Sequence, residues 1–458
     1  MVILKIRLPL LACCLTLCIF STVWSQNTEP FVEPQWKTEL GGNAGALVVS
    51  GKKGVFGSHS LDLKLGQIQC VDLTDGHLVW TANFPRLKPI WQDNPSNPIR
   101  SITTAQNNKV VVYTNRGTIV CFDLNGTLDG TNDGIKTELE RNNSDIIWHR
   151  DLVGEFKVFK RSSIGFGMPE PSPVVIGDRV VCATGNGSTL GIERFFDGNL
   201  VVPQPESPTV VCLNLADGKT VWTNNEFSKN VKHSAVASPI RIENKKSSAL
   251  VFVPGDGRGY GLSESDGKVL WSTNKELFLW SWTSPYAVED KVVICNSLPS
   301  ELAWKGSPTG IVCYETETLL TAKDKKPLWV FQDDRYRGSL VPPVVKNGIL
   351  FVLTDSAFLL AIDLVNSKLL WSEEIDYSVN DQSGLTAVGN RIIVPVAYGF
   401  ECFTASRSKD KVGSVETNVL NQTKIGTFKD TIVVGSPKAC HSFSLESLFP
   451  KLFKKSTF

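Results

Sequence analysis

The sequence lacks most of the features that mark a metalloenzyme, a membrane-spanning protein or a nucleic-acid-binding protein. Its five histidines show no metal-ligand spacing, and there is no Cys-x-x-Cys-His haem motif. No apolar run after residue 23 is long enough to span a bilayer. The 47 basic residues balance 46 acidic ones, which argues against nucleic acid as the main partner. No long helical period occurs, so an α-rich fold is excluded.

The first residues have the pattern of an export signal. Lys5 and Arg7 come before an apolar run, and small residues follow that run up to Ser25. We expect cleavage after Ser25, which makes residues 1–25 a signal peptide and residues 26–458 a single domain. An uncleaved anchor is the lesser alternative. The mature chain would carry 45 basic and 46 acidic residues and would be periplasmic or extracellular.

Cysteine is present but not in a disulfide pattern. Of the eleven cysteines, Cys13, Cys14 and Cys18 lie in the expected signal, and lipid attachment at Cys13 ranks below simple secretion. The other eight could form disulfides in an exported protein. Six of them, however, share one position of an internal repeat, where two other copies have Gly261 and Ala361. Such a position requires a small buried side chain, so we expect free buried thiols.

That repeat is the main structural signal in the chain. Its clearest copy, residues 209–222, is an apolar strand, an Asp217-Gly218 turn and a second strand that ends in Trp222. The other copies end at Trp80, Trp148, Trp271, Trp329 and Trp371. Before each copy comes a short strand, a tight turn and a longer strand. The unit therefore predicts four antiparallel strands, and the 42-residue spacing of the last two tryptophans is typical of a propeller blade.

Eight of these upstream parts occur, so the sequence predicts an all-β fold, an eight-bladed β-propeller of four-stranded antiparallel blades. Trp36 is expected to end an orphan outer strand, and residues 425–445 to form a unit that lacks one. We expect strands from the N- and C-terminal ends to complete the last blade together, because the ring would otherwise leave an open sheet edge. The unit that begins at Cys402 has no tryptophan, and Val412 or Val415 is expected in its place.

The repeat resembles the PQQ-like, or quinoprotein-type, β-propeller repeat. One copy shows the matching residues, which are Cys212, Asn214, Asp217-Gly218 and Trp222. The resemblance covers nearly all of the expected mature chain. The family includes quinone-dependent dehydrogenases and non-enzymatic binding scaffolds, among them the lipoprotein that assists outer-membrane barrel assembly. We expect the tryptophans to pack between sheets. We expect the acid or amide two residues after the small residue of each copy, such as Asn214, to cap a turn.

The resemblance also implies what a dehydrogenase of this family would need, namely adjacent cysteines whose disulfide ring stacks on the cofactor. The only such pair, Cys13-Cys14, lies in the expected signal. We therefore predict a non-enzymatic binding or scaffolding module without a cofactor or metal, a monomer with a protein or glycan partner. The alternative is a quinone-dependent sugar or alcohol oxidoreductase that uses pyrroloquinoline quinone with calcium.

Long connecting segments point to one face of the ring. In an antiparallel blade, the connection between the second and third strands emerges on the same face as the connection to the next blade. Five long segments belong to these two classes, residues 81–100, 151–171, 184–207, 272–283 and 296–308. Two others, residues 126–146 and 316–327, fall on the opposite face. Long loops are usually functional, so we predict binding at the first face, around the channel mouth.

The candidate residues on that face are mainly arginine and tryptophan, which are enriched at contact sites. They are Trp91, Arg100, Arg161, Arg194, His233, Trp280, Trp282, Arg335 and Arg337. An arginine cluster could also bind a carboxylate or phosphate. The alternative for each arginine is an ordinary solvated loop residue.

Overall fold

The computed structural model describes residues 31–450, apart from residues 61–64, 86–98, 100, 105–107, 115, 132–133, 135–140, 160–170, 188–200, 232–234, 274–282, 297–309, 340, 377–383, 421–422 and 424. Internal contacts divide the chain into residues 1–31 and residues 32–458, and the architecture below is that of the second unit.

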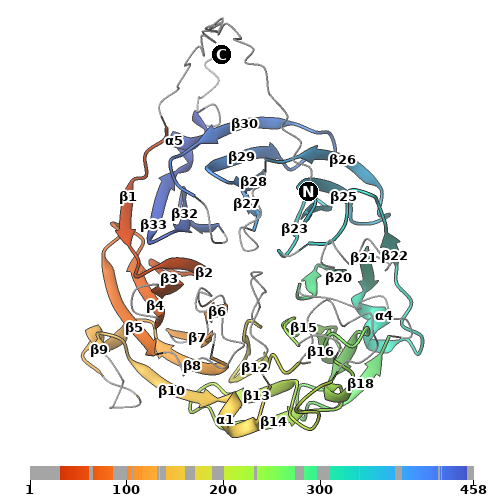
Figure 1. Ribbon diagram of the computed structural model, residues 1–458. Helices are drawn as coiled ribbons and strands as arrows, with labels where there is room; N and C mark the ends of the chain where they lie inside the picture. The colour runs from red at the N-terminus through yellow and green to blue at the C-terminus, as the bar shows by residue number, and fades with distance from the viewer. Residues whose placement is uncertain are drawn as a thin grey trace, which may run out of the picture. The chain divides into compact units, whose positions relative to one another are not determined.

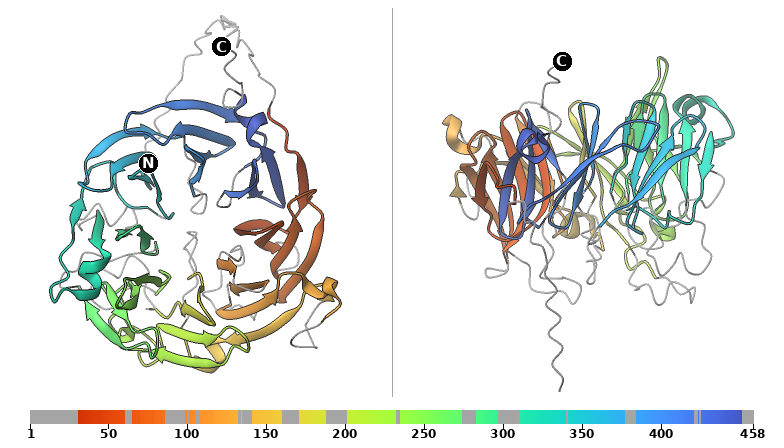
Figure 2. Two further views of the ribbon diagram at one scale, coloured as in Figure 1. Left: turned by 180° about the vertical axis from the view of Figure 1, so that it is seen from behind. Right: turned by 90° about the horizontal axis from the view of Figure 1, so that it is seen from above.

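This unit is a ring of eight antiparallel sheets arranged around an axis (Figure 1), which Figure 2 shows from behind and edge-on. Seven sheets have four strands, and one has a fifth strand added at its outer edge. The first strand of each blade lies nearest the axis and the fourth lies at the rim. The predicted eight-bladed propeller is therefore confirmed.

Within each blade the strand nearest the axis is named first and the outermost strand last. Blade 1 is β2 (Asn43–Ser50), β3 (Lys53–Ser60), β4 (Leu65–Asp72) and β5 (Leu78–Pro85), with β9 (Arg141–Asn142) outside β5. Blade 2 is β6 (Ser101–Thr104), β7 (Lys109–Tyr113), β8 (Thr118–Asp123) and β10 (Ile146–Asp151). Blade 3 is β11 (Val174–Ile176), β12 (Arg179–Ala183), β13 (Val210–Asn214) and β14 (Thr220–Asn224). Blade 4 is β15 (Ile240–Glu243), β16 (Ser248–Phe252), β17 (Tyr260–Leu262) and β18 (Val269–Ser272).

The second half of the ring follows the same order. Blade 5 is β19 (Tyr286–Val288), β20 (Lys291–Cys295), β21 (Ile311–Glu315) and β22 (Trp329–Phe331). Blade 6 is β23 (Val344–Lys346), β24 (Ile349–Leu353), β25 (Phe358–Asp363) and β26 (Leu369–Glu374). Blade 7 is β27 (Thr386–Val388), β28 (Arg391–Val396), β29 (Gly399–Thr404) and β30 (Lys411–Glu416), and blade 8 is β31 (Gly426–Phe428), β32 (Thr431–Ser436), β33 (Ala439–Ser444) and β1 (Trp36–Glu39). Among the described residues, the short helices are η1 (Gly126–Asp129), α1 (Leu152–Phe156), η2 (Ser228–Asn230), α4 (Thr316–Thr321) and α5 (Leu445–Leu448).

Blade 8 closes the ring with strands from both ends of the chain. β1 pairs antiparallel with β33, so that Trp36 lies opposite Ser442 and Thr38 lies opposite Cys440. β33 in turn pairs with β32, where Val433 faces Ser442. The predicted closure is confirmed, and it gives β33 a partner that the C-terminal strands alone do not supply.

The repeat tryptophans join each blade to the next. In its own blade each one lies opposite the small residue of the repeat, as Trp222 lies opposite Cys212. Except at Trp271, its indole N–H then donates to a backbone carbonyl of the following blade, for example from Trp148 to Leu215 O at 2.9 Å. In blades 1, 3 and 4, which have an Asp-Gly turn, the tryptophan of the preceding blade covers the glycine of that turn, as Trp148 covers Gly218. This confirms that the tryptophans pack between neighbouring sheets.

Blade 7 departs from the expected pattern. Gly413, and neither Val412 nor Val415, lies opposite Cys402. The register shift beside Cys402 is the same as that beside Ala361 in blade 6, so Gly413 occupies the position that Trp371 has there, while Val412 and Val415 pack against the neighbouring apolar cluster. Phe400 and Phe443 lie together in the apolar cluster of blades 7 and 8, with ring centroids 5.9 Å apart.

The remaining repeat positions behave as predicted. All eight cysteines after residue 25 are free and buried. Burial raises the pKa of the Cys295 thiol to about 12, so it stays protonated and packs as a small apolar group. At the acid or amide position of the repeat, Asp72 accepts from Thr74 N at 2.8 Å and Asn214 accepts from Ala216 N at 2.8 Å. These side chains therefore cap turns.

Candidate functional site

We call the face that carries the connections between second and third strands and between blades the loop-rich face. The strand order confirms that these two classes of connection emerge together there. Of the nine predicted contact residues, the structure describes Arg335 and Arg337. The other seven, Trp91, Arg100, Arg161, Arg194, His233, Trp280 and Trp282, lie outside the described residues and stay predictions.

Arg335 and Arg337 flank a buried anchor in the connection between blades 5 and 6. The hydroxyl of Tyr336 donates to Asn296 O at 2.7 Å, and burial raises its pKa well above the usual value. Arg335 is held by both carboxylate oxygens of Asp333, at 2.7 Å each. That ion pair lowers the pKa of Asp333. Arg337 is exposed, so it is the arginine of the two that is free to contact a partner.

Hydrogen bonds between neighbouring blades form a belt at the loop-rich end of the channel. The donors and acceptors lie at or just before the innermost strand of each blade, and most of them are buried serine or threonine. The four bonds are Ser101 Oγ to Pro171 O at 2.5 Å, Ser172 N to Ser238 Oγ at 2.7 Å, Ser238 N to Ser284 Oγ at 2.9 Å, and Thr283 Oγ1 to Ser339 O at 2.5 Å. We call these residues the Ser/Thr belt. It links blades 2 to 6 in sequence.

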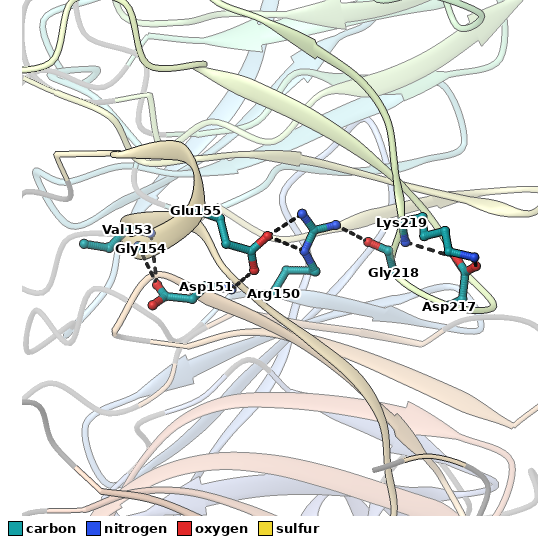
Figure 3. Close-up of polar contacts among 8 residues, drawn as sticks. All are labelled: Arg150, Asp151, Val153, Gly154, Glu155, Asp217, Gly218 and Lys219. Atoms are coloured by element: carbon teal, nitrogen blue, oxygen red, sulfur yellow. Dashed lines mark hydrogen bonds and ion pairs between the residues drawn. The ribbon is translucent and has the colours of Figure 1, made fainter.

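A second fixed point lies where the chain leaves blade 2 (Figure 3). Asp151 begins α1 by accepting from the N–H groups of Val153 and Gly154 at 3.1 and 3.0 Å, which satisfies donors at the helix start. Arg150 pairs with Glu155 and also donates to Gly218 O of blade 3 at 2.5 Å. The pairing lowers the pKa of Glu155. The connection that carries Arg161 therefore starts from a rigid base.

A buried carboxylate stabilises a turn on the loop-rich face of blade 4. Asp256 lies in the turn between β16 and β17 and accepts from the Tyr260 hydroxyl at 2.5 Å and from Arg258 N at 3.0 Å. Burial raises the pKa of Asp256, and burial together with the carboxylate raises that of Tyr260. The turn links two strands and no helix follows it, so the glycine-rich residues 255–259 form a hairpin turn.

A cleft of about 670 Å³ lies on the opposite face, between the β11–β12 turn and blade 4. Val181 and Leu250 contribute apolar surface to it. Its arginines are engaged with neighbours: Arg241 contacts Glu264 at 2.9 Å, and Arg179 donates to Glu264 O at 2.7 Å. The sequence did not predict this cleft, because its walls come from turns of ordinary length.

The described residues lack both a metal-binding cluster and a membrane-spanning helix. They contain no group of three or more His, Cys, Asp or Glu side chains placed to hold a metal ion. Within the same part of the chain, no helix has the length and apolar character needed to cross a bilayer.

Sequence reasoning missed the Ser/Thr belt. The only local signal is a Ser-Pro pair before the innermost strand in three copies, at Ser172, Ser238 and Ser284. The acceptor of each bond lies in the next blade, 46 or 66 residues further along the chain for the serine pairs. Such a partner becomes visible only when the ring is assembled.

Comparison with known proteins places the chain in a family. The family model described as outer membrane protein assembly factor BamB matches residues 147–382, just over half of the chain. The outer membrane protein assembly factor BamB of Yersinia pestis is 24% identical over 188 residues. That match covers 40% of this chain and 43% of the relative, so the chain spans less than half the length of the relative it matches.

Solved structures share the fold at low sequence identity. BamB from Moraxella catarrhalis has a TM-score of 0.57 and 11% identity, covering 90% of this chain and 99% of that one. Sqt1 from Saccharomyces cerevisiae has a TM-score of 0.56 and 10% identity, covering 91% and 99%. The computationally designed protein Ika8 has a TM-score of 0.53 and 12% identity, covering 89% and 97%. At these identities the likeness shows the fold alone.

Proposed function

The chain belongs to the family described as outer membrane protein assembly factor BamB, and from this membership we propose that it is a non-enzymatic scaffold that holds protein partners during the assembly of outer-membrane proteins. A scaffold requires a rigid body and exposed contact residues rather than a reactive centre. The propeller supplies the body through inter-blade tryptophans and the Ser/Thr belt. Arg337 supplies one exposed cation on the loop-rich face.

One observation carries the choice of face. The family match spans residues 147–382, and the Ser/Thr belt joins blades 2 to 6, which is nearly the same part of the ring. A hydrogen-bonded base at the loop-rich end of the channel lowers the conformational entropy lost when a partner binds there. We therefore propose that Trp91, Arg100, Arg161, Arg194, His233, Trp280, Trp282, Arg335 and Arg337 contribute to partner binding on this face.

We further propose that residues 1–25 are a signal peptide, that residues 26–458 are one domain, and that the protein acts as a monomer in the periplasm. Lys5 and Arg7 before the apolar run support export. Mass determination of the protein from its native envelope tests the cleavage site directly.

Affinity capture from solubilised envelope tests the scaffold and its face. The combined change of Trp91, Trp280 and Arg194 to alanine is expected to abolish capture of outer-membrane assembly proteins. Arg337→Ala alone is expected to weaken capture without a change in melting temperature, because its side chain is exposed. The matched control is Lys52→Ala, an exposed cation in a turn of the opposite face. Equal capture by all variants would refute the proposed face.

The enzyme alternative and a glycan partner are separated by two short experiments. Purified protein mixed with pyrroloquinoline quinone and calcium is expected to show no bound chromophore and no dye reduction with sugars or alcohols. Robust reduction would overturn the scaffold proposal. A glycan array is expected to show no specific binding, whereas a selective signal would make a carbohydrate the ligand.

A further inference from the structure

The cleft on the face opposite to the loop-rich face lies between the inner strands of blades 3 and 4. Its volume of about 670 Å³ is within the range of small-molecule sites. One wall is β11 and the start of β12, where Ile176 pairs with Arg179. The other wall belongs to blade 4, where Arg241 pairs with Leu250. Leu250 and Val181 belong to one buried apolar cluster, so the floor of the cleft is apolar.

Arg241 occupies a position where the other blades have a small neutral residue. The strand registers place it level with Val175 of β11 and Val345 of β23, and all seven counterparts are valine, threonine or alanine. Val345 packs in the apolar cluster that joins its blade to the preceding one. An arginine is not buried there without a partner, and its guanidinium contacts Glu243 at 2.6 Å and Glu264 at 2.9 Å instead. The apolar side chain that would fill this junction is therefore absent.

Arg179 is the cation of the cleft that keeps free donors. Its Nη1 donates to Glu264 O at 2.7 Å, and its side chain is 35% exposed. Within the described chain, its nearest carboxylate is that of Asp178, which lies 3.9 Å from Nε and is 85% exposed. Lys53 has the same repeat position in blade 1 and makes the equivalent bond, to Leu124 O at 3.2 Å. A lysine is thus sufficient to join two blades, and the guanidinium of Arg179 has further N–H groups for an anion.

We propose that this cleft binds a small monocarboxylate with an aliphatic body, such as a medium-chain fatty acid. The aliphatic chain would lie on Ile176, Val181 and Leu250, and the carboxylate would accept from the free N–H groups of Arg179. An ammonium compound is disfavoured, because it would meet the guanidinium while the carboxylate on the blade 4 wall is already paired with Arg241. The inference goes beyond the proposed function, which concerns the other face of the ring.

Calorimetric titration of the full chain with four small probes tests both the charge and the apolar floor. Octanoate is expected to bind at least about ten-fold more tightly than octanol, because the alcohol lacks the charge that Arg179 recognises. Octylamine is expected not to bind. Butyrate is expected to bind at least about ten-fold more weakly than octanoate, because it buries fewer CH₂ groups. Equal affinities for octanoate and octanol, or tighter binding of octylamine, would overturn the inference.

Two variants place the probe in the cleft. Arg179→Lys keeps a bond between the blades, as Lys53 does in blade 1, but removes the spare donors, so octanoate affinity is expected to fall about five- to ten-fold. Arg391→Lys is the matched control, since Arg391 has the same repeat position in blade 7, and it should leave the affinity unchanged. Ile176→Trp adds a large side chain at a half-buried position of the wall and is expected to abolish octanoate binding.

The melting temperature of each variant shows whether it is folded. If Ile176→Trp does not fold, the comparison of Arg179→Lys with Arg391→Lys decides alone. Octanoate affinity that is equal in these two arginine variants would overturn the inference. Capture of outer-membrane assembly proteins by Arg179→Lys is expected to match that of the unchanged protein, because the cleft and the proposed partner face lie on opposite sides of the ring. A loss of capture would show that the cleft holds a protein segment and would refute the assignment to a small carboxylate.

Discussion

Replacement of Gly218 by alanine tests how much the contact between blades 2 and 3 contributes to stability. Gly218 has φ +70°, and an added Cβ would lie 2.7 Å from Trp148 Cδ2. Alanine in the left-handed region costs roughly 1–2 kcal/mol, and an extra methyl group forced into a packed contact costs about 1–3 kcal/mol more. A more restricted unfolded chain offsets about 0.4–1 kcal/mol of this. We expect the free energy of unfolding to fall by about 2–4 kcal/mol.

Gly348 provides a control that isolates the indole contact. It also has φ +70°, but a Cβ built there meets nothing within 4 Å. Gly348→Ala is therefore expected to lose only about 1 kcal/mol, from backbone strain less the effect on the unfolded chain. Urea denaturation followed by far-UV circular dichroism measures both variants, and the m-values should match.

The double variant makes the test more specific. Trp148→Phe removes the N–H that donates to Leu215 O, and it also removes the larger ring that the alanine at position 218 would meet. The two changes share one contact, so their combined loss of stability should be smaller than the sum of the separate losses. Equal losses for Gly218→Ala and Gly348→Ala, together with strict additivity, would refute the role given to the tryptophan.

Three further outcomes follow from the structure. Burial lowers the pKa of His441 to about 4, so between this value and the ordinary pKa of 6.5 the unfolded chain binds more protons than the folded chain. The contribution of His441 to stability is therefore complete above pH 6.5 and is lost as the pH falls towards 4. His441→Gln should make the urea midpoint less dependent on pH in this range, and an unchanged dependence would refute the assignment. The eight buried thiols should not react with a thiol reagent at about pH 8 until guanidinium unfolds the protein, and fast native labelling would contradict their burial. Lys325 donates to Leu319 O at 2.7 Å and to Ala322 O at 2.6 Å. Lys325→Met should therefore lower the free energy of unfolding by about 1–3 kcal/mol in urea denaturation, whereas Lys326→Met, at an exposed position, should be neutral. Equal effects of the two variants would count against this capping role.

The sequence predicts the ring well because each blade repeats its own turn chemistry. Asp217-Gly218 and its counterparts fix where one strand ends and the next begins, and the tryptophan marks the rim. The isolated strand at Trp36 has no partner nearby in the sequence, and that isolation is what made closure by both chain ends predictable. Local pattern and global topology agree at these points.

The same reasoning fails where a partner lies in another blade. Trp271 has the repeat position, yet its buried indole nitrogen has no hydrogen-bond partner within the described chain, and blade 5 has α4 where blades 1, 3 and 4 have the Asp-Gly turn. Lys325 instead lies 5.3 Å over the indole ring. A sequence pattern that treats every tryptophan alike does not reveal this exception.

The candidate site was predictable only in its position on the ring. Loop length places it on one face, and that follows from strand order alone. Which arginine is available depends on neighbours, since Arg335 is held by Asp333 and Arg337 is exposed. Two arginines separated by one buried tyrosine look equivalent in the sequence. They differ because a carboxylate lies within reach of only the first among the described residues.

The Ser/Thr belt joins blades 2 to 6 and leaves out blade 8, and ring closure gives a physical reason for this. Blade 8 is made from both chain ends, so its order depends on a contact between residues about 400 positions apart, as in Trp36 and Ser442. Its outer strand β1 also carries charged side chains, which oppose pairing with another strand, and Lys37 and Glu39 are paired at 2.7 Å. Blades 3 to 5 are built from continuous chain and are joined by the Ser/Thr belt. A partner that binds the loop-rich face at these blades therefore does not compete with closure of the ring.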